Sequence, residues 1–123
     1  RYISVTGVQT CALPISTVQA TKTGAVSDAI NDMVGGFSIL EGNGRGSGER
    51  QTIRAGRGTG TYVAEYNKVA VVVTYVDDAD VEKVSTAIAG AAFTGKGGDG
   101  IISVSSIESV LNIASKKTGS EAL

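Results

Sequence analysis

The sequence of 123 residues contains no histidine, no tryptophan, one cysteine and one proline. Without histidine, the chain cannot carry out histidine-based acid–base catalysis or form a Ser-His-Asp triad, and an enzyme is therefore not expected. The single cysteine, Cys11, excludes a disulfide within the chain and leaves no basis for a Cys/His zinc site. No metal site is predicted from the residues.

Long apolar runs and an excess of one charge are also lacking. No run approaches the ~20 apolar residues that cross a bilayer, so direct membrane insertion is not expected. The net charge of −1 provides no general basic field, so no nucleic-acid partner is predicted. With 41% hydrophobic and 19% charged residues, the composition is that of one globular domain. A reducing, cytoplasmic location is the expectation.

Glycine, by contrast, is abundant, and it is concentrated in residues 42–60. This segment holds seven glycines and the arginines Arg45, Arg50, Arg54 and Arg57, with Ile53 as its only large apolar residue. It cannot bury enough apolar surface to offset its ordering entropy, so a mobile, exposed loop is predicted. A loop this long in a small domain is typically functional.

Residues 1–16 differ from the remainder. They contain Cys11 and Pro14 and do not begin with methionine. The segment resembles the translated remnant of a sequencing adapter, and we predict a non-native leader over 1–16. The alternative is an additional strand, since Tyr2, Ile3 and Val5 have high β propensity.

Apolar spacing predicts the secondary structure of the rest. Helices are expected from Gly24 to Met33 and around Val81 to Ala91, where apolar residues recur three and four positions apart. Strands are expected at 37–40, 69–76, 101–104 and 111–113, with a residual strand at 16–21 and a helical turn at 105–110. Residues 62–66 can extend the strand 69–76 as a ribbon.

The resulting order predicts an α+β, ferredoxin-like βαββαβ sandwich, with an antiparallel sheet backed by two helices on one face. The other face would remain bare, so the chain should form an oligomer that covers it. A trimer is one common solution.

Two glycine clusters flank the same pair of strands. TGKGGDG, at 94–100, can turn tightly and present N–H groups to an anion, with Lys96 adding charge. GRGSG, at 44–48, can approach a ligand closely. The alternatives are a plain turn and a flexible linker. Together the clusters favour a shared nucleotide site.

Residues 16–123 resemble the PII family of nitrogen-regulatory signalling proteins. The resemblance is carried by GGFSILEGNGRG, EYNKV, TGKGGDG followed by two isoleucines, and TGSEAL. It assigns residues 17–123 to a PII-like domain, with a T-loop at about 42–66 and a B-loop at 94–100. It also implies a non-enzymatic homotrimer that binds ATP or ADP between subunits, and 2-oxoglutarate beside Mg²⁺ and ATP. The T-loop would dock onto an ammonium transporter, glutamine synthetase or another regulator of nitrogen metabolism.

The resemblance also implies roles for single residues. Nucleotide contacts fall on Ser38, Gly46, Ser47, Gly48, Thr74, Thr94, Gly98, Asp99, Gly100 and Ile101. Contacts to 2-oxoglutarate fall on Lys68 and Gly48. The partner-binding loop would present Arg45, Arg50, Arg54, Arg57 and Tyr62.

Three departures from the family pattern concern the implied ligand site. Ser47-Gly48 lacks the side chain of the family's glutamine at the T-loop base, Ile101 replaces a lysine, and Asn112 and Ala114 replace two arginines. One alternative is therefore a PII-like paralogue with an altered or lost ligand. Another is a small enzyme using Asp99, Glu65 and Lys68, although such residues on loops are more often simply solvated.

Overall fold

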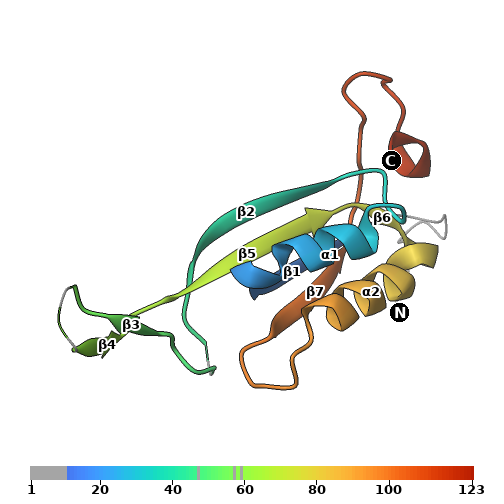
Figure 1. Cartoon of the computed structure of the whole chain (residues 1–123). Helices are drawn as coiled ribbons and strands as arrows, with labels where there is room; N and C mark the ends of the chain where they lie inside the picture. The colour runs from blue at the N-terminus through green and yellow to red at the C-terminus, as the bar shows by residue number, and fades with distance from the viewer. Residues whose placement is uncertain (1–10, 47, 57, 59) are drawn as a thin grey trace.

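The computed structural model describes residues 11–46, 48–56, 58 and 60–123. Its main sheet is antiparallel and contains β2 (Phe37–Gly44), β5 (Asn67–Thr74), β1 (Cys11–Gln19) and the short β6 (Val76–Asp77), with β7 (Gly100–Ser106) on the other side of β1. Figure 1 shows β1 and β5 at the centre of this sheet. The arrangement confirms the ferredoxin-like fold predicted from the order of elements.

Strand β1 begins at Cys11, so the domain boundary predicted after residue 16 falls inside a central strand. Residues 11–19 alternate between buried and half-buried after Cys11 and Ala12, because neighbouring side chains of a strand point to opposite faces. The foreign origin of the leader stays a prediction, and the strand expected around Tyr2 to Val8 lies outside the described residues.

Pro14 occupies a position in β1 that tolerates a missing N–H group. On one side of the strand the partner changes from β5, which pairs with Ile15–Gln19, to β6, which pairs with Cys11 and Ala12. Pro14 lies at the break between these two partners and is paired only with Val104 of β7. A proline inside a sheet is usually confined to such interruptions.

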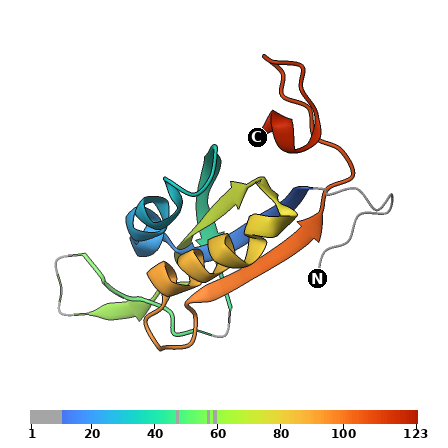
Figure 2. The ribbon, with the colours of Figure 1, turned by 90° about the vertical axis from the view of Figure 1, so that its right-hand side faces the viewer.

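Helices α1 (Thr23–Ile30) and α2 (Val81–Ala92) cover one face of the sheet, as Figure 2 shows. Short 3-10 turns precede them, η1 (Ala20–Lys22) and η2 (Asp78–Asp80). Ile30 and Ile88 are almost fully buried against Val72 in the sheet. Both predicted helices are confirmed, although α1 ends three residues before Met33, whose side chain still packs on the core.

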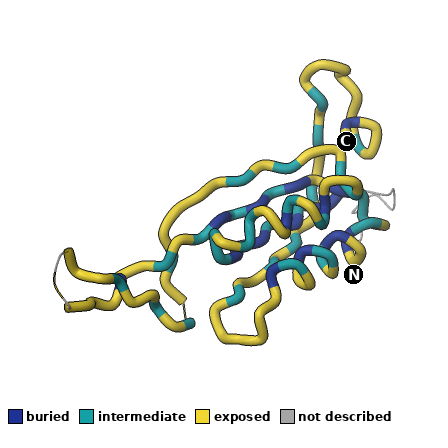
Figure 3. Tube along the Cα trace, in the orientation of Figure 1, coloured by how far each residue is buried: buried dark blue, intermediate teal, exposed yellow. Residues whose placement is uncertain are grey.

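No helix of the described residues lies over the opposite face of the sheet. Leu40, Val71, Thr17 and Ile101 form one row of cross-strand partners on this face. Leu40 is 62% and Ile101 73% exposed, and Figure 3 shows how exposure is distributed along the chain. The bare face expected from the topology is therefore present, and its row contains apolar side chains.

The described residues of 42–60 (42–46, 48–56, 58 and 60) are largely exposed, as predicted, but they contain regular structure. Strand β2 continues to Gly44, and β3 (Thr52–Arg54) pairs with β4 (Thr61–Val63) in a separate ribbon that protrudes from the domain (Figure 1). Further hydrogen bonds close the ribbon, from Ala55 N to Gly60 O at 2.9 Å and from Ala64 N to Gln51 O at 2.7 Å. These backbone bonds supply order that apolar burial alone does not.

The C-terminal segment differs from the prediction. Strand β7 continues to Ser106 because Ser106 pairs with Ala12, so the helical turn expected at 105–110 was wrong. A single bridge between Leu111 and Thr118 replaces the strand expected at 111–113. The chain ends in a 3-10 turn, η3 (Gly119–Ala122), which buries Ala122. In the part of the chain that the structure describes, no helix is long and apolar enough to cross a membrane.

Candidate ligand-binding site

A cavity of about 690 Å³ lies where β2 ends and β5 begins. Four segments line it: the end of β1 with η1, the turn after β2, the start of β5, and the residues around Gly98. The lining includes six residues that the sequence assigned to ligand binding: Gly46, Gly48, Lys68, Gly98, Gly100 and Ile101. The two glycine clusters are thus brought to one site.

The charge of the cavity suits an anion. Arg45 and Lys68 are the charged residues among its described lining, which contains no aspartate or glutamate. Gln19, Gln51 and Asn67 add neutral polar groups, while the remaining wall is partly apolar. Phosphate or carboxylate groups would find two cations and several amide donors here.

Magnesium fits this lining less well. Mg²⁺ is usually held through one or two carboxylates together with substrate phosphates. No carboxylate lines the described cavity, and no group of three or more metal-ligating side chains occurs among the residues that the structure describes. The described lining therefore fits an anionic ligand and contains no carboxylate that could hold a metal beside it.

Gly48 and Gly98 bring the two loops into direct backbone contact. A Cβ atom on Gly48 would lie 2.6 Å from Gly98 Cα and 2.9 Å from the Gly97 carbonyl oxygen. Gly98 also has a positive φ of 95°, which favours glycine. The segment around Gly48 and the loop at 94–100, predicted as the T-loop base and the B-loop, therefore touch within one chain, and larger residues at these positions would separate them.

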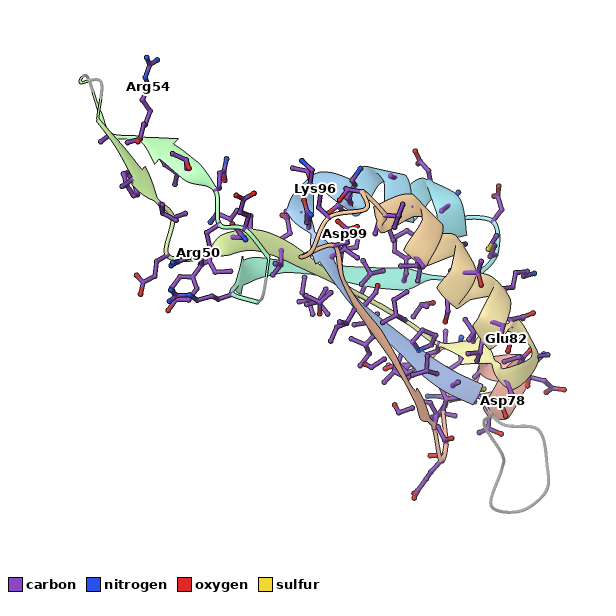
Figure 4. All side chains as sticks on the ribbon, turned by 90° about the horizontal axis from the view of Figure 1, so that it is seen from below. Arg50, Arg54, Asp78, Glu82, Lys96 and Asp99 are labelled. Atoms are coloured by element: carbon purple, nitrogen blue, oxygen red, sulfur yellow. The ribbon has the colours of Figure 1, made fainter. Side chains whose placement is uncertain are left out.

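Asp99 holds the B-loop in shape. Its carboxylate accepts hydrogen bonds from Thr94 N at 2.7 Å, from Gly95 N at 3.1 Å and from Gln19 Nε2 at 3.3 Å, and a short one from the Thr94 hydroxyl. The hydrogen bonds from Thr94 hold the pKa of Asp99 below its usual value. The N–H groups of Thr94 and Gly95 are therefore directed at the loop's own carboxylate. Figure 4 shows Asp99 beside Lys96 in this loop.

Asp99→Asn is expected to loosen the B-loop, because the neutral amide is a weaker acceptor and its NH₂ group cannot accept hydrogen bonds. We expect severalfold faster amide exchange at Thr94 and Gly95, with the helices unchanged. In the native protein, a carboxyl pKa that is lower when folded stabilises the loop above the unfolded pKa of about 3.9. That contribution disappears only as the pH falls through the folded pKa. The protection of the Thr94 and Gly95 amides, after correction for their intrinsic exchange rates, should therefore be constant between pH 7 and 5. A loop that loosens within that range would contradict this role.

Four described residues that were predicted to contact nucleotide do not line the cavity, namely Ser38, Thr74, Thr94 and Asp99, and the first two lie far from it. Ser38 is on β2 and Thr74 on β5, at the opposite ends of these strands from Gly44 and Lys68. The Thr74 side chain is buried, and its hydroxyl donates to the Gly36 carbonyl oxygen at 2.7 Å. Within one protomer, the structure does not bring these two residues to the cavity.

The arginines of the T-loop separate into different positions. Arg54 and Tyr62 lie on the ribbon, where Tyr62 is 53% exposed, whereas Arg45 lines the cavity. Figure 4 shows Arg50 near the base of the loop and Arg54 far out on the ribbon. Arg57 and Ser47 lie outside the described residues.

Sequence reasoning missed the neutral amides of the site. Gln19 Nε2 donates to the Gly98 carbonyl oxygen at 3.4 Å, and the Asn67 side chain binds the backbone at Glu49 and Gln51. No pattern in the sequence distinguishes these side chains from ordinary polar residues. Lys96, expected to add phosphate-binding charge, is not among the residues that line the cavity.

Comparisons with known proteins agree with the fold. The family model described as nitrogen regulatory protein P-II matches residues 15–117. Among solved structures, the chain is similar to Arabidopsis thaliana PII bound to citrate, with a TM-score of 0.73 and 20% sequence identity over 93% of this chain and 92% of that one. At this identity the structural likeness supports the fold, and the family match identifies the chain. Because that match covers most of its length, the protein belongs to the nitrogen regulatory protein P-II family.

Proposed function

We propose that this protein is a PII-type signalling protein, not an enzyme, that binds ATP or ADP and reports its ligand state through the T-loop. The main support is the cavity between the T-loop base and the B-loop, whose charged residues are Arg45 and Lys68. A ligand there would touch the segment that leads directly into the ribbon. Ligand binding would then shift the ribbon between its populated conformations.

The proposal includes a cytoplasmic homotrimer. The apolar row on the bare sheet face supplies a surface for subunit contact. In such an assembly, the nucleotide site between subunits would include or be supported by Ser38, Thr74, Thr94 and Asp99. The ribbon, with Arg54 and Tyr62, would dock onto an ammonium transporter, glutamine synthetase or another regulator of nitrogen metabolism.

Calorimetry tests the ligand directly. ATP, ADP and AMP would be titrated with and without Mg²⁺ and 2-oxoglutarate, with citrate as a second carboxylate probe. We expect adenine nucleotide to bind, and Lys68→Ala and Arg45→Ala each to weaken anion binding about tenfold to a hundredfold, since a hydrogen bond to a charged group is worth ~1.5–3 kcal/mol.

Lys96→Ala is the matched control, because it removes a B-loop cation that does not line the cavity. Failure of every nucleotide to bind would overturn the sensing proposal. Turnover of ATP well above background would overturn its non-enzymatic part.

A second candidate is a PII-like regulator whose ligand has changed or been lost. It is favoured by the lining itself, because Ile101 stands at the cavity and the T-loop base offers Gly46 and Gly48 without long side chains. Binding of AMP or a small carboxylate in preference to ATP would support this candidate. Tight MgATP binding that is cooperative with 2-oxoglutarate would exclude it.

A further inference from the structure

Asn67 occupies the point where the T-loop leaves and rejoins the sheet. It is the first residue of β5, and its backbone pairs with Gly44, the last residue of β2. Its side chain also binds the backbone of the segment that leads into the ribbon. Asn67 Oδ1 accepts from Gln51 N at 3.1 Å, and Asn67 Nδ2 donates to the Glu49 carbonyl oxygen at 3.1 Å. The described residues between Gly44 and Gln51 (45, 46 and 48–50) are therefore closed into a small loop whose two ends meet at Asn67.

This small loop, which we call the base loop (the described residues 45, 46 and 48–50), carries contacts to the cavity. Arg45, Gly46 and Gly48 line the cavity, and Gly48 lies against Gly98. Any displacement of Gly98 or Gly48 must therefore be accommodated within a loop that Asn67 closes.

Gln51 connects the base loop to the ribbon. Its N–H group donates to Asn67, and its carbonyl oxygen accepts from Ala64 N at 2.7 Å. Gln51 directly precedes β3, and Ala64 directly follows β4. Gly98 thus contacts Gly48, the next residue Glu49 accepts a hydrogen bond from Asn67, and Asn67 in turn binds Gln51 at the start of the ribbon.

These two hydrogen bonds require an asparagine or a residue with the same donor and acceptor groups. One acceptor and one donor must lie on the same short side chain, and the partners determine which way the amide points. Aspartate preserves the acceptor for Gln51 N but presents a second acceptor to the Glu49 carbonyl oxygen. Alanine provides neither.

We propose that Asn67 is a positioning residue that holds the base loop over the cavity and couples the B-loop to the ribbon. The coupling to ligand rests on the proposed function, whereas the closure of the base loop does not. Loss of the side chain should release the base loop and the ribbon together and leave the sheet intact.

The test is hydrogen–deuterium exchange on the ligand-free protein, comparing Asn67→Ala and Asn67→Asp with the native chain. Asn43→Ala is the matched control, since Asn43 is an exposed asparagine on the adjacent strand, paired with Lys68. In Asn67→Ala we expect severalfold faster exchange at Gln51, Ala64 and the ribbon strands, with native rates in β1 and β5. Asn67→Asp should keep part of the protection at Gln51, because its acceptor remains, and it also serves if the alanine variant does not fold.

A ribbon in Asn67→Ala that exchanges as slowly as in Asn43→Ala would overturn the proposal. If nucleotide binding changes the exchange rates of the ribbon in the native protein, that change should be absent in Asn67→Ala. The variant should also bind the nucleotide severalfold more weakly. A native protein that binds no nucleotide would defeat the proposed function alone, since the ligand-free exchange measurement still decides the role of Asn67.

Discussion

Gly100→Ala is expected to lower the free energy of unfolding by ~3 kcal/mol or more, which combines backbone strain with overpacking. Gly100 opens β7 with a φ of 120°, a value that residues with a side chain rarely adopt. A Cβ atom there would overlap the Thr17 carbonyl oxygen and lie 3.1 Å from Val18 Cα. These atoms belong to the backbone of β1, so they cannot move aside without disturbing the β1–β7 pairing.

Chemical denaturation monitored by circular dichroism measures this change, and the melting temperature should fall by roughly 10 °C or more for a domain of this size. Gly90→Ala is the matched control, because Gly90 lies within α2 and a Cβ atom there would contact nothing within 4 Å. It should stabilise the protein by about 0.5–1 kcal/mol, the usual gain for alanine over glycine in a helix. Equal stability of the Gly100→Ala variant and the native chain would show that the strand accommodates the added atom.

Leu40→Glu is expected to abolish the proposed oligomer. Leu40 is 62% exposed in the protomer and faces the same side as Val71 and Thr17. A glutamate there can remain hydrated in a monomer, but assembly would bury its charge among apolar side chains without a partner. A closed trimer would place three such charges in its contacts, so the native oligomer should be replaced by monomer at micromolar concentration.

Sedimentation or light scattering after size exclusion measures the mass, and circular dichroism verifies that the protomer remains folded. Val63→Glu is the matched control, since Val63 is 55% exposed on the ribbon and lies outside the main sheet. A native chain that is monomeric, or a Leu40→Glu variant with the native mass, would show that this face is not the subunit interface.

Local patterns in the sequence were sufficient for most elements of the fold. The apolar spacing of Val81, Val84 and Ile88 predicted α2, and the β-branched run at 69–76 predicted the strand beside β1, because helix and strand periodicities follow from backbone geometry. Local patterns were not sufficient where pairing with a distant strand outweighed local preference. Ala12 to Ser16 lie in β1 through their pairing with β7, and Ser105 and Ser106 remain in β7 through their pairing with β1.

The candidate site was predictable only in part, for the same reason. The glycines at 44–48 and 94–100 indicate backbone that turns tightly or approaches a ligand closely, and residue type alone is enough to predict this. Residue type does not predict that the two loops touch at Gly48 and Gly98. It also does not predict the hydrogen bond from Gln19 to a carbonyl oxygen 79 residues away.

By itself, then, the sequence determined the class of fold, the absence of histidine chemistry, the glycine-rich loops and the resemblance to PII proteins. Only the tertiary structure decided that Arg45 lines the cavity with Lys68, that Asp99 binds its own loop, and that Asn67 closes the T-loop base. Composition and periodicity are properties of neighbouring residues in the chain. A binding site depends on which distant side chains the sheet pairing places at the same end of the strands.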